Sequence, residues 1–136
     1  MTEINFIVNP PAYYWQNYGE IKEITDMLSR LSKNIDLFNY TFDIRFISIT
    51  PIIAPDEVIH SPEFCEKTLM CMDSGIANIS LYSDYNDFCL GDLQKKKAII
   101  VENIIASVKL VKNKTVEYFD FEKLERDIIR LAYLTK

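Results

Sequence analysis

The strongest constraint on the fold is a stripe of apolar residues near the start of the chain. These residues recur at intervals of three and four: Ile21, Ile24, Leu28, Leu31 and Ile35. This spacing predicts an amphipathic helix, because it brings the apolar side chains onto one face. Asn17 and Glu20, which have the spacing of a capping box, mark its start. One face of this helix must therefore be buried against other elements.

Runs with strand character lie on both sides of this helix. They cover residues 4–8, 41–53, 64–73 and 76–82. The last two are separated by Asp73-Ser74-Gly75, which has the composition of a turn. Because the last three runs follow one another along the chain, we expect them to form an antiparallel meander.

The remainder of the chain has helical patterns. A short helical turn is expected at residues 84–88, a long helix from Gly91-Asp92 to about Val111, and a last helix capped by Asp120. Their buried stripes are Val101, Ile104, Ile105, Val108 and Val111 in the long helix, and Phe121, Leu124, Ile128 and Leu131 in the last one. The order β-α-β-β-β-α-α predicts a single α+β domain over residues 1–136, with helices packed on a small, mostly antiparallel sheet.

The length and composition agree with one globular domain. The chain has 136 residues, of which 49% are hydrophobic and 26% charged. No apolar run approaches the roughly 18 residues of a membrane helix, and Glu3 interrupts the start of the chain. Three cysteines without a signal segment indicate reduced thiols. We therefore expect a cytoplasmic protein without membrane association.

The charge is negative overall and unevenly distributed. The net charge is -5; residues 1–92 hold 14 acidic and 5 basic side chains, whereas residues 93–136 hold 6 acidic and 10 basic ones. A nucleic-acid-binding protein normally shows a basic surface, so the balance argues against that class. An acidic surface favours a basic protein partner.

The residues needed for common catalytic and metal sites are scarce. His60 is the single histidine, and with Cys65, Cys71 and Cys89 it forms no short metal-binding spacing. Three glycines cannot build a phosphate-binding loop. We therefore expect no metal, no cofactor and no enzymatic activity. The enzymatic alternative is a carboxylate pair among Asp84, Asp87 and Asp92, as in a glycosidase.

Two clusters of aromatic residues are candidates for protein recognition. The first combines aromatic with acidic residues: Tyr82, Asp84, Tyr85, Asp87 and Asp92. The second contains Tyr13, Tyr14 and Trp15, with Tyr18 beside it. Aromatic side chains are enriched at the centres of interfaces, and carboxylates complement a basic partner. The structural alternatives are a solvated connection for the first cluster and rings packed over the first helix for the second.

One further charge cluster, Lys95-Lys96-Lys97, lies near the start of the long helix. Its position is unfavourable for the helix dipole, which hints at a functional basic spot. The simpler interpretation is a solvated helix face.

Three segments of the chain resemble bacterial immunity proteins of polymorphic toxin and contact-dependent growth inhibition systems. They are Tyr82–Phe88, Lys95–Val108 and Phe119–Ile128, and the step Tyr18-Gly19-Glu20 is similar to a Gly-Glu step in several such families. The resemblance implies a protein that binds a cognate toxin domain and blocks its active site or its access to substrate. A cytosol-acting, basic nuclease is the expected toxin. The alternative is a small adaptor or regulator with another protein partner.

Overall fold

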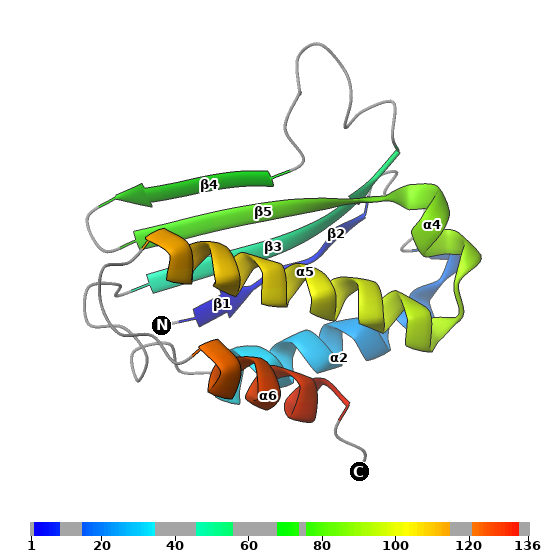
Figure 1. Ribbon diagram of the computed structural model, residues 1–136. Helices are drawn as coiled ribbons and strands as arrows, with labels where there is room; N and C mark the ends of the chain where they lie inside the picture. The colour runs from blue at the N-terminus through cyan, green and yellow to red at the C-terminus, as the bar shows by residue number, and fades with distance from the viewer. Residues whose placement is uncertain are drawn as a thin grey trace.

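The computed structural model describes residues 2–8, 15–34, 46–55, 68–73, 76–114 and 121–133. Strands and helices are mixed, with the helices on one face of a small sheet (Figure 1). The strands are β1 (Thr2–Ile4), β2 (Ile7–Val8), β3 (Phe46–Ala54), β4 (Thr68–Asp73) and β5 (Ile76–Asp84). The helices are α2 (Tyr18–Asn34), α4 (Tyr85–Leu90), α5 (Leu93–Lys114) and α6 (Phe121–Ala132).

The sheet differs from the predicted antiparallel meander. Its order is β1-β3-β5-β4, with β2 continuing beside β3 in the register of β1. The pairings of β1, β2 and β5 with β3 are parallel, and among the described strands only β4 pairs in an antiparallel manner, with β5. The expectation of a mostly antiparallel sheet was therefore wrong.

The physical reason lies in the connections. The predicted hairpin of β4 and β5 is confirmed, with Asp73 opposite Ile76. However, β5 rather than β4 lies beside β3, because the chain between Ala54 and Thr68 is long enough to place β4 on the outer side of β5. The crossover through α2 makes β1 and β3 parallel, as in a β-α-β unit.

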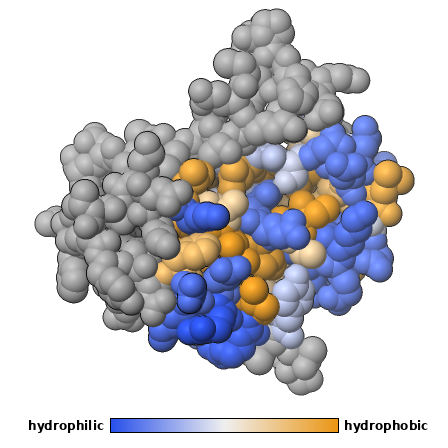
Figure 2. Space-filling view, in the orientation of Figure 1, coloured by the Kyte–Doolittle hydropathy of each residue, from blue (hydrophilic) through white to orange (hydrophobic). Residues whose placement is uncertain are grey.

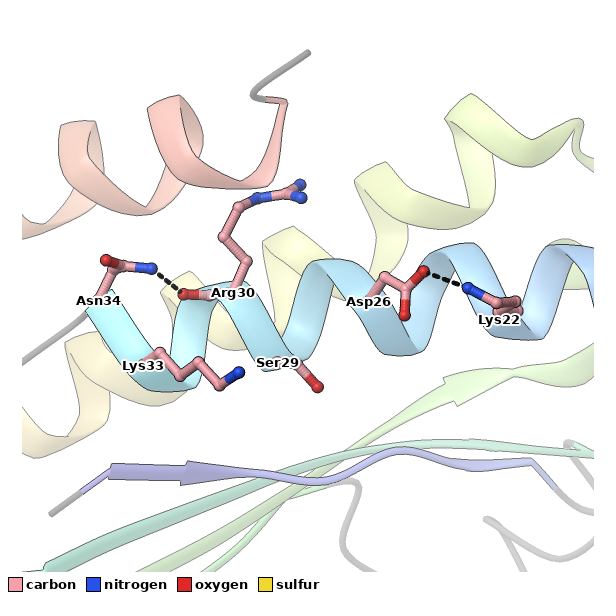
Figure 3. Close-up of a pocket in the computed structure, with 6 residues that line it drawn as sticks. All are labelled: Lys22, Asp26, Ser29, Arg30, Lys33 and Asn34. Carbon is pink, nitrogen blue, oxygen red and sulfur yellow. Dashed lines mark hydrogen bonds and ion pairs between the residues drawn. The ribbon is translucent and has the colours of Figure 1, made fainter. Parts of the chain in front are cut away.

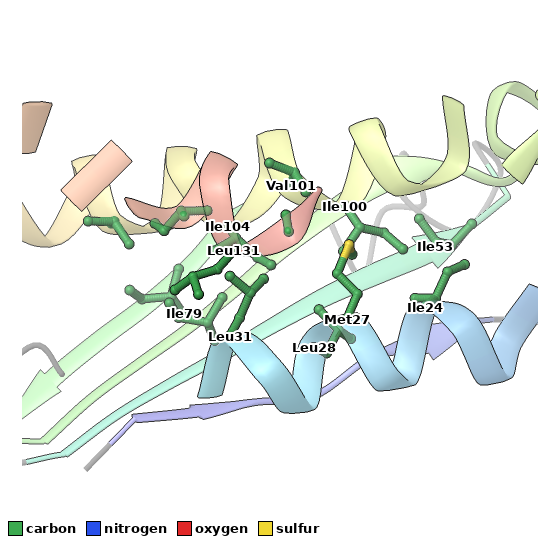
Figure 4. Packing of buried hydrophobic residues seen from close by; sticks show 14 of the residues in the cluster. Ile24, Met27, Leu28, Leu31, Ile53, Ile79, Ile100, Val101, Ile104 and Leu131 are labelled. Atoms are coloured by element: carbon green, nitrogen blue, oxygen red, sulfur yellow. The ribbon is translucent and has the colours of Figure 1, made fainter. Parts of the chain in front are cut away.

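The core lies between the sheet and two helices. Helices α2 and α5 pack on the same face of the sheet, and α6 packs against both of them (Figure 1). The side chains that fill this layer are aliphatic: Ile24, Met27, Leu28 and Leu31 from α2, Ile53 and Ile79 from the strands, Ile100, Val101 and Ile104 from α5, and Leu131 from α6 (Figure 4). Full burial of each contributes about 1.5–3 kcal/mol, so this layer provides the main stabilisation.

Helical periodicity predicted this core well. The expected stripes of α2, α5 and α6 are buried at Ile21, Val101, Val108, Leu124 and Ile128, whereas Ile105 and Phe121 are only partly buried. On the exposed side of α6, Lys123 forms an ion pair with Asp127 at 3.2 Å. Ile35 and Asp120 lie outside the described residues.

Within the part of the chain that the structure describes, none of the helices combines the length and the hydrophobicity that a membrane-spanning segment needs.

Candidate functional site

The end of β5 and the start of α4 form one wall of an acidic hollow. Asp84 terminates β5 and caps α4, because its Oδ2 accepts a hydrogen bond of 3.0 Å from the backbone N–H of Asp87. This is the usual role of aspartate at a helix N-cap. The chain thus turns directly from strand to helix, and Asp87 follows in the first turn of α4 with an exposed side chain.

The other wall of the hollow comes from α5. Asn103 Nδ2 donates to Ser83 Oγ at 2.8 Å and thereby holds α5 against β5. The hollow has a volume of about 250 Å³. It is lined by Tyr82, Ser83, Asp84, Asp87, Ile99, Glu102 and Asn103. We call it the acidic hollow, because three of its residues are acidic and none of those described in its lining is lysine or arginine.

The carboxylates of the acidic hollow differ in their surroundings. Asp87 and Glu102 are exposed, whereas Asp84 Oδ1 is buried and has no hydrogen-bond partner in the described part of the chain. A buried acceptor without a donor costs about 1–3 kcal/mol, and such groups in native proteins require an explanation. Because this oxygen is closed off from solvent, the carboxylates that the acidic hollow presents at the surface are those of Asp87 and Glu102.

Glu102 also acts on a neighbouring helix. Burial raises the pKa of the Tyr133 hydroxyl above its usual value of 10.0, and the negative charge of Glu102 raises this pKa further. Glu102 is therefore close enough to Tyr133, directly after α6, for the two side chains to interact electrostatically.

The structure brings together only part of the first predicted cluster. Tyr82, Asp84 and Asp87 all contribute to the lining, but Tyr85 and Asp92 do not. Tyr82 comes from β5, where it lies opposite Ile52 of β3 in the parallel register. Tyr85 is half-buried against the core. Of these two tyrosines, only Tyr82 therefore lines the acidic hollow.

Asp92 has a structural role at the start of α5. Its Oδ1 accepts from the backbone N–H of Lys95 at 2.9 Å, and its carbonyl accepts from that of Lys96 at 2.9 Å. Asp92 is thus the N-cap of α5, and its side chain remains exposed. Its charge contributes to the surface near the hollow without lining it.

The second predicted cluster is described only in part. Tyr13 and Tyr14 lie outside the described residues. Trp15 is 87% exposed and Tyr18 is 69% exposed, so neither of these two rings packs over the first helix as a covering layer. Leu90, at the end of α4, is 83% exposed and was not predicted as a site residue.

The lysine triplet is solvated only in part, since Lys95 is exposed but Lys96 is buried. Lys96 is only 5% exposed; its Nζ donates to Glu20 Oε2 at 2.8 Å and lies 5.8 Å from the centre of the Phe88 ring. Lys97 pairs with Glu23 at 3.4 Å. Two of the three lysines are therefore neutralised by α2, and the expected solvated face was wrong for Lys96.

A second charged hollow lies along α2, with a volume of about 490 Å³ (Figure 3). It is lined by Lys22, Asp26, Ser29, Arg30, Lys33 and Asn34. Here Lys22 pairs with Asp26 at 2.9 Å. Arg30 donates from Nε to the Leu131 carbonyl at 2.6 Å and from Nη2 to that of Ala132 at 3.1 Å. Its charged groups are thus largely engaged within the fold.

Sequence reasoning missed Glu102, Ile99 and Asn103. All three belong to α5 and reach the acidic hollow only because α5 packs beside β5. The helical period identifies the buried side of α5 but not the strand that flanks it. His60 and Cys65 lie outside the described residues, and Cys89 is a partly buried free thiol. Among the described residues, no group of three or more His, Cys, Asp or Glu could hold a metal ion.

Comparison with known proteins agrees with the resemblance to immunity proteins. Residues 5–132 match the model of the family described as Immunity protein 44. No curated protein and no solved structure matched the chain. The family match spans nearly all of the chain, and membership of an immunity family implies a cognate toxin as partner. The chain therefore belongs to the Immunity protein 44 family.

Proposed function

We propose that this chain neutralises a basic, cytosol-acting nuclease toxin by binding it through the acidic hollow and covering its active site or its route to substrate. The observation that carries this proposal is the grouping of Asp84, Asp87 and Glu102 without a cation in the lining. A nuclease holds phosphates with lysine and arginine. A fixed group of carboxylates competes for the same side chains.

The exposed carboxylates support a partner with cationic donors. Asp87 and Glu102 are both exposed at the acidic hollow. A lysine or arginine of the toxin that enters the hollow can pair with them, and a charged hydrogen bond is worth about 1.5–3 kcal/mol.

The charge of the surface also favours rapid capture. Opposite charges raise association rates by about 10–1,000-fold over those of neutral surfaces. Speed matters for an antidote because the toxin must be bound before it reaches its substrate.

The experiment uses the toxin domain encoded by the neighbouring gene. Cells that produce this domain are expected to grow only when they also produce the wild-type chain, and the two proteins are expected to co-purify. In vitro, the wild-type chain is expected to stop cleavage of plasmid DNA or ribosomal RNA by the toxin. Failure of the wild-type chain to protect or to co-purify contradicts the proposed function.

A double variant with two reversed charges tests the role of the acidic hollow. Asp87→Lys combined with Glu102→Lys is expected to weaken toxin binding at least tenfold, measured by isothermal titration calorimetry. The control is Glu122→Lys, which reverses an exposed charge in the first turn of α6. Equal affinities of the double variant and wild type contradict the role of the acidic hollow, even if the toxin is neutralised.

A further inference from the structure

Three strongly exposed apolar side chains lie at one end of the molecule. They are Trp15, Tyr18 and Leu90, with exposed fractions of 87%, 69% and 83%. We call them the apolar end patch. Tryptophan and leucine side chains this exposed are unusual, and groups of them on a surface indicate an interaction site.

Ion pairs place Tyr18 and Leu90 at the same end of the molecule, and Trp15 precedes Tyr18 by three residues. Glu20 and Glu23, in the first turns of α2, bind Lys96 and Lys97, in the first turns of α5. The two helices therefore begin side by side, at the end where β2, β3 and β5 finish (Figure 1). Tyr18 opens α2, and Leu90 precedes α5 by three residues.

The apolar end patch continues into the acidic hollow. Asp87 and Leu90 are separated by three residues in α4, which places them on the same side of the helix, about 5–6 Å apart at Cβ. Figure 2 shows a hydrophobic group that projects at the right-hand end, where α4 joins α5 in Figure 1, with hydrophilic residues on both sides.

The charges around the patch fit a basic partner. Asp87 and Asp92 are exposed beside Leu90. Of the three neighbouring lysines, Lys96 and Lys97 are paired with Glu20 and Glu23, whereas Lys95 is exposed. The patch thus has an apolar centre and a charged border that includes Asp87 and Asp92, which agrees with the usual arrangement of an interface centre and its polar rim.

We propose that the apolar end patch is the energetic centre of the contact with the toxin, and that it receives an apolar surface of the toxin bordered by lysine or arginine. This inference rests on the proposed function. In this arrangement the carboxylates control the association rate. The aromatic and leucine side chains, which become buried in the complex, control the dissociation rate.

The experiment measures both rate constants by biolayer interferometry, with the catalytically inactive toxin domain of the neighbouring gene immobilised. Trp15→Ala and Leu90→Ser are each expected to raise the dissociation rate at least tenfold and to change the association rate by less than about threefold. The matched control is Ile129→Ser in α6, where the side chain is 42% exposed, and it is expected to leave both rates unchanged.

A second measurement does not depend on a substitution. Trp15 is the single tryptophan of the chain, so incorporation of 5-fluorotryptophan gives one fluorine resonance. Addition of the unlabelled toxin domain is expected to shift this resonance, because the indole becomes buried.

The outcomes separate this inference from the proposed function. If the wild-type chain binds the toxin but the Trp15 and Leu90 variants dissociate at the wild-type rate and the resonance does not move, only the inference is overturned. If the wild-type chain does not bind the toxin, both are overturned. If sedimentation shows a dimer of the free chain that Leu90→Ser dissociates, the patch serves a second copy of the chain and the inference is wrong.

Discussion

The acidic hollow and the hollow along α2 are both lined by charged side chains, yet only the second contains charges of both signs. Along α2, Lys22 is paired with Asp26, and Arg30 binds two carbonyls at the end of α6. In the acidic hollow, Asp87 and Glu102 are exposed with no lysine or arginine in the described lining. The charged groups along α2 thus have partners within the fold, whereas the acidic hollow groups charges of one sign.

The difference separates charges that hold the fold together from charges that bind the toxin in the proposed function. Grouped carboxylates repel one another and lower the stability of the free chain, so their presence at one place indicates a function. Mixed charges along α2 stabilise contacts between helices. Substitutions in the two regions should therefore have different effects on stability and on toxin binding.

The largest effect is expected beneath the acidic region. Phe88 is fully buried, and its ring lies 6.1 Å from that of Phe6 and below the ammonium group of Lys96. Phe88→Ala is expected to lower the free energy of unfolding by about 3–5 kcal/mol, because it leaves a cavity under α4. Urea denaturation checks this value. A loss below about 1 kcal/mol would show that α4 is not anchored through this ring.

Arg30→Ala tests the structural role of the α2 hollow. Loss of the two hydrogen bonds to Leu131 and Ala132 is expected to lower the free energy of unfolding by about 1.5–3 kcal/mol. Toxin affinity at a temperature where the variant is folded is expected to equal that of wild type. Thermal unfolding measures the loss of stability, and titration calorimetry measures the toxin affinity. A variant that loses affinity but keeps its stability would reverse the assignment of the two regions.

Neutralising one carboxylate in each region sharpens the comparison. Asp87→Asn is expected to slow association with the toxin by about two- to fivefold at low ionic strength, and by less at 0.5 M salt, because exposed charges are screened. The matched change Asp26→Asn is expected to leave the association rate unchanged. Stopped-flow measurements at several salt concentrations check both. If the association rates of the two variants depended on salt concentration in the same way, the two hollows would not differ in their contribution to toxin binding.

The smallest effect concerns the pair on α2. The hydrogen bond and charge of Asp26 raise the pKa of Lys22 above its usual value of 10.5. Asp26→Asn is therefore expected to return this pKa toward 10.5, as followed by NMR of the lysine side chain. Because the folded-state pKa is the raised one, the stabilisation by this pair is complete below 10.5 and is lost as the pH rises through the folded value. An unchanged pKa would mean that the pair does not form in solution.

The helices and their buried faces could be predicted because they depend on local spacing. Ile24, Leu28 and Leu31 are buried as their period requires, and Asp84 and Asp87 lie together because a helix cap links them. The partner of β3 could not be predicted in the same way. The apolar pattern of a strand does not specify which strand lies beside it. The order along the chain favours β4 as the neighbour of β3, but in the structure this neighbour is β5.

The candidate site shows the same division. Asp84 and Asp87 are close in sequence and were predicted to lie together, whereas Glu102 comes from another element and was not predicted to join them. The sequence also grouped Tyr82, Tyr85 and Asp92 with these carboxylates, and of the three only Tyr82 lines the acidic hollow.

Residue types and short spacings are enough to predict the order of the elements, the buried helix faces and the acidic surplus of residues 1–92, and they carry the resemblance to immunity proteins. The mainly parallel sheet, the pairing of Lys96 and Lys97 with Glu20 and Glu23, and the position of Glu102 beside Asp84 and Asp87 are visible only in the folded chain. These features join residues far apart in the chain, and their contacts are set by how α2 and α5 pack on the sheet.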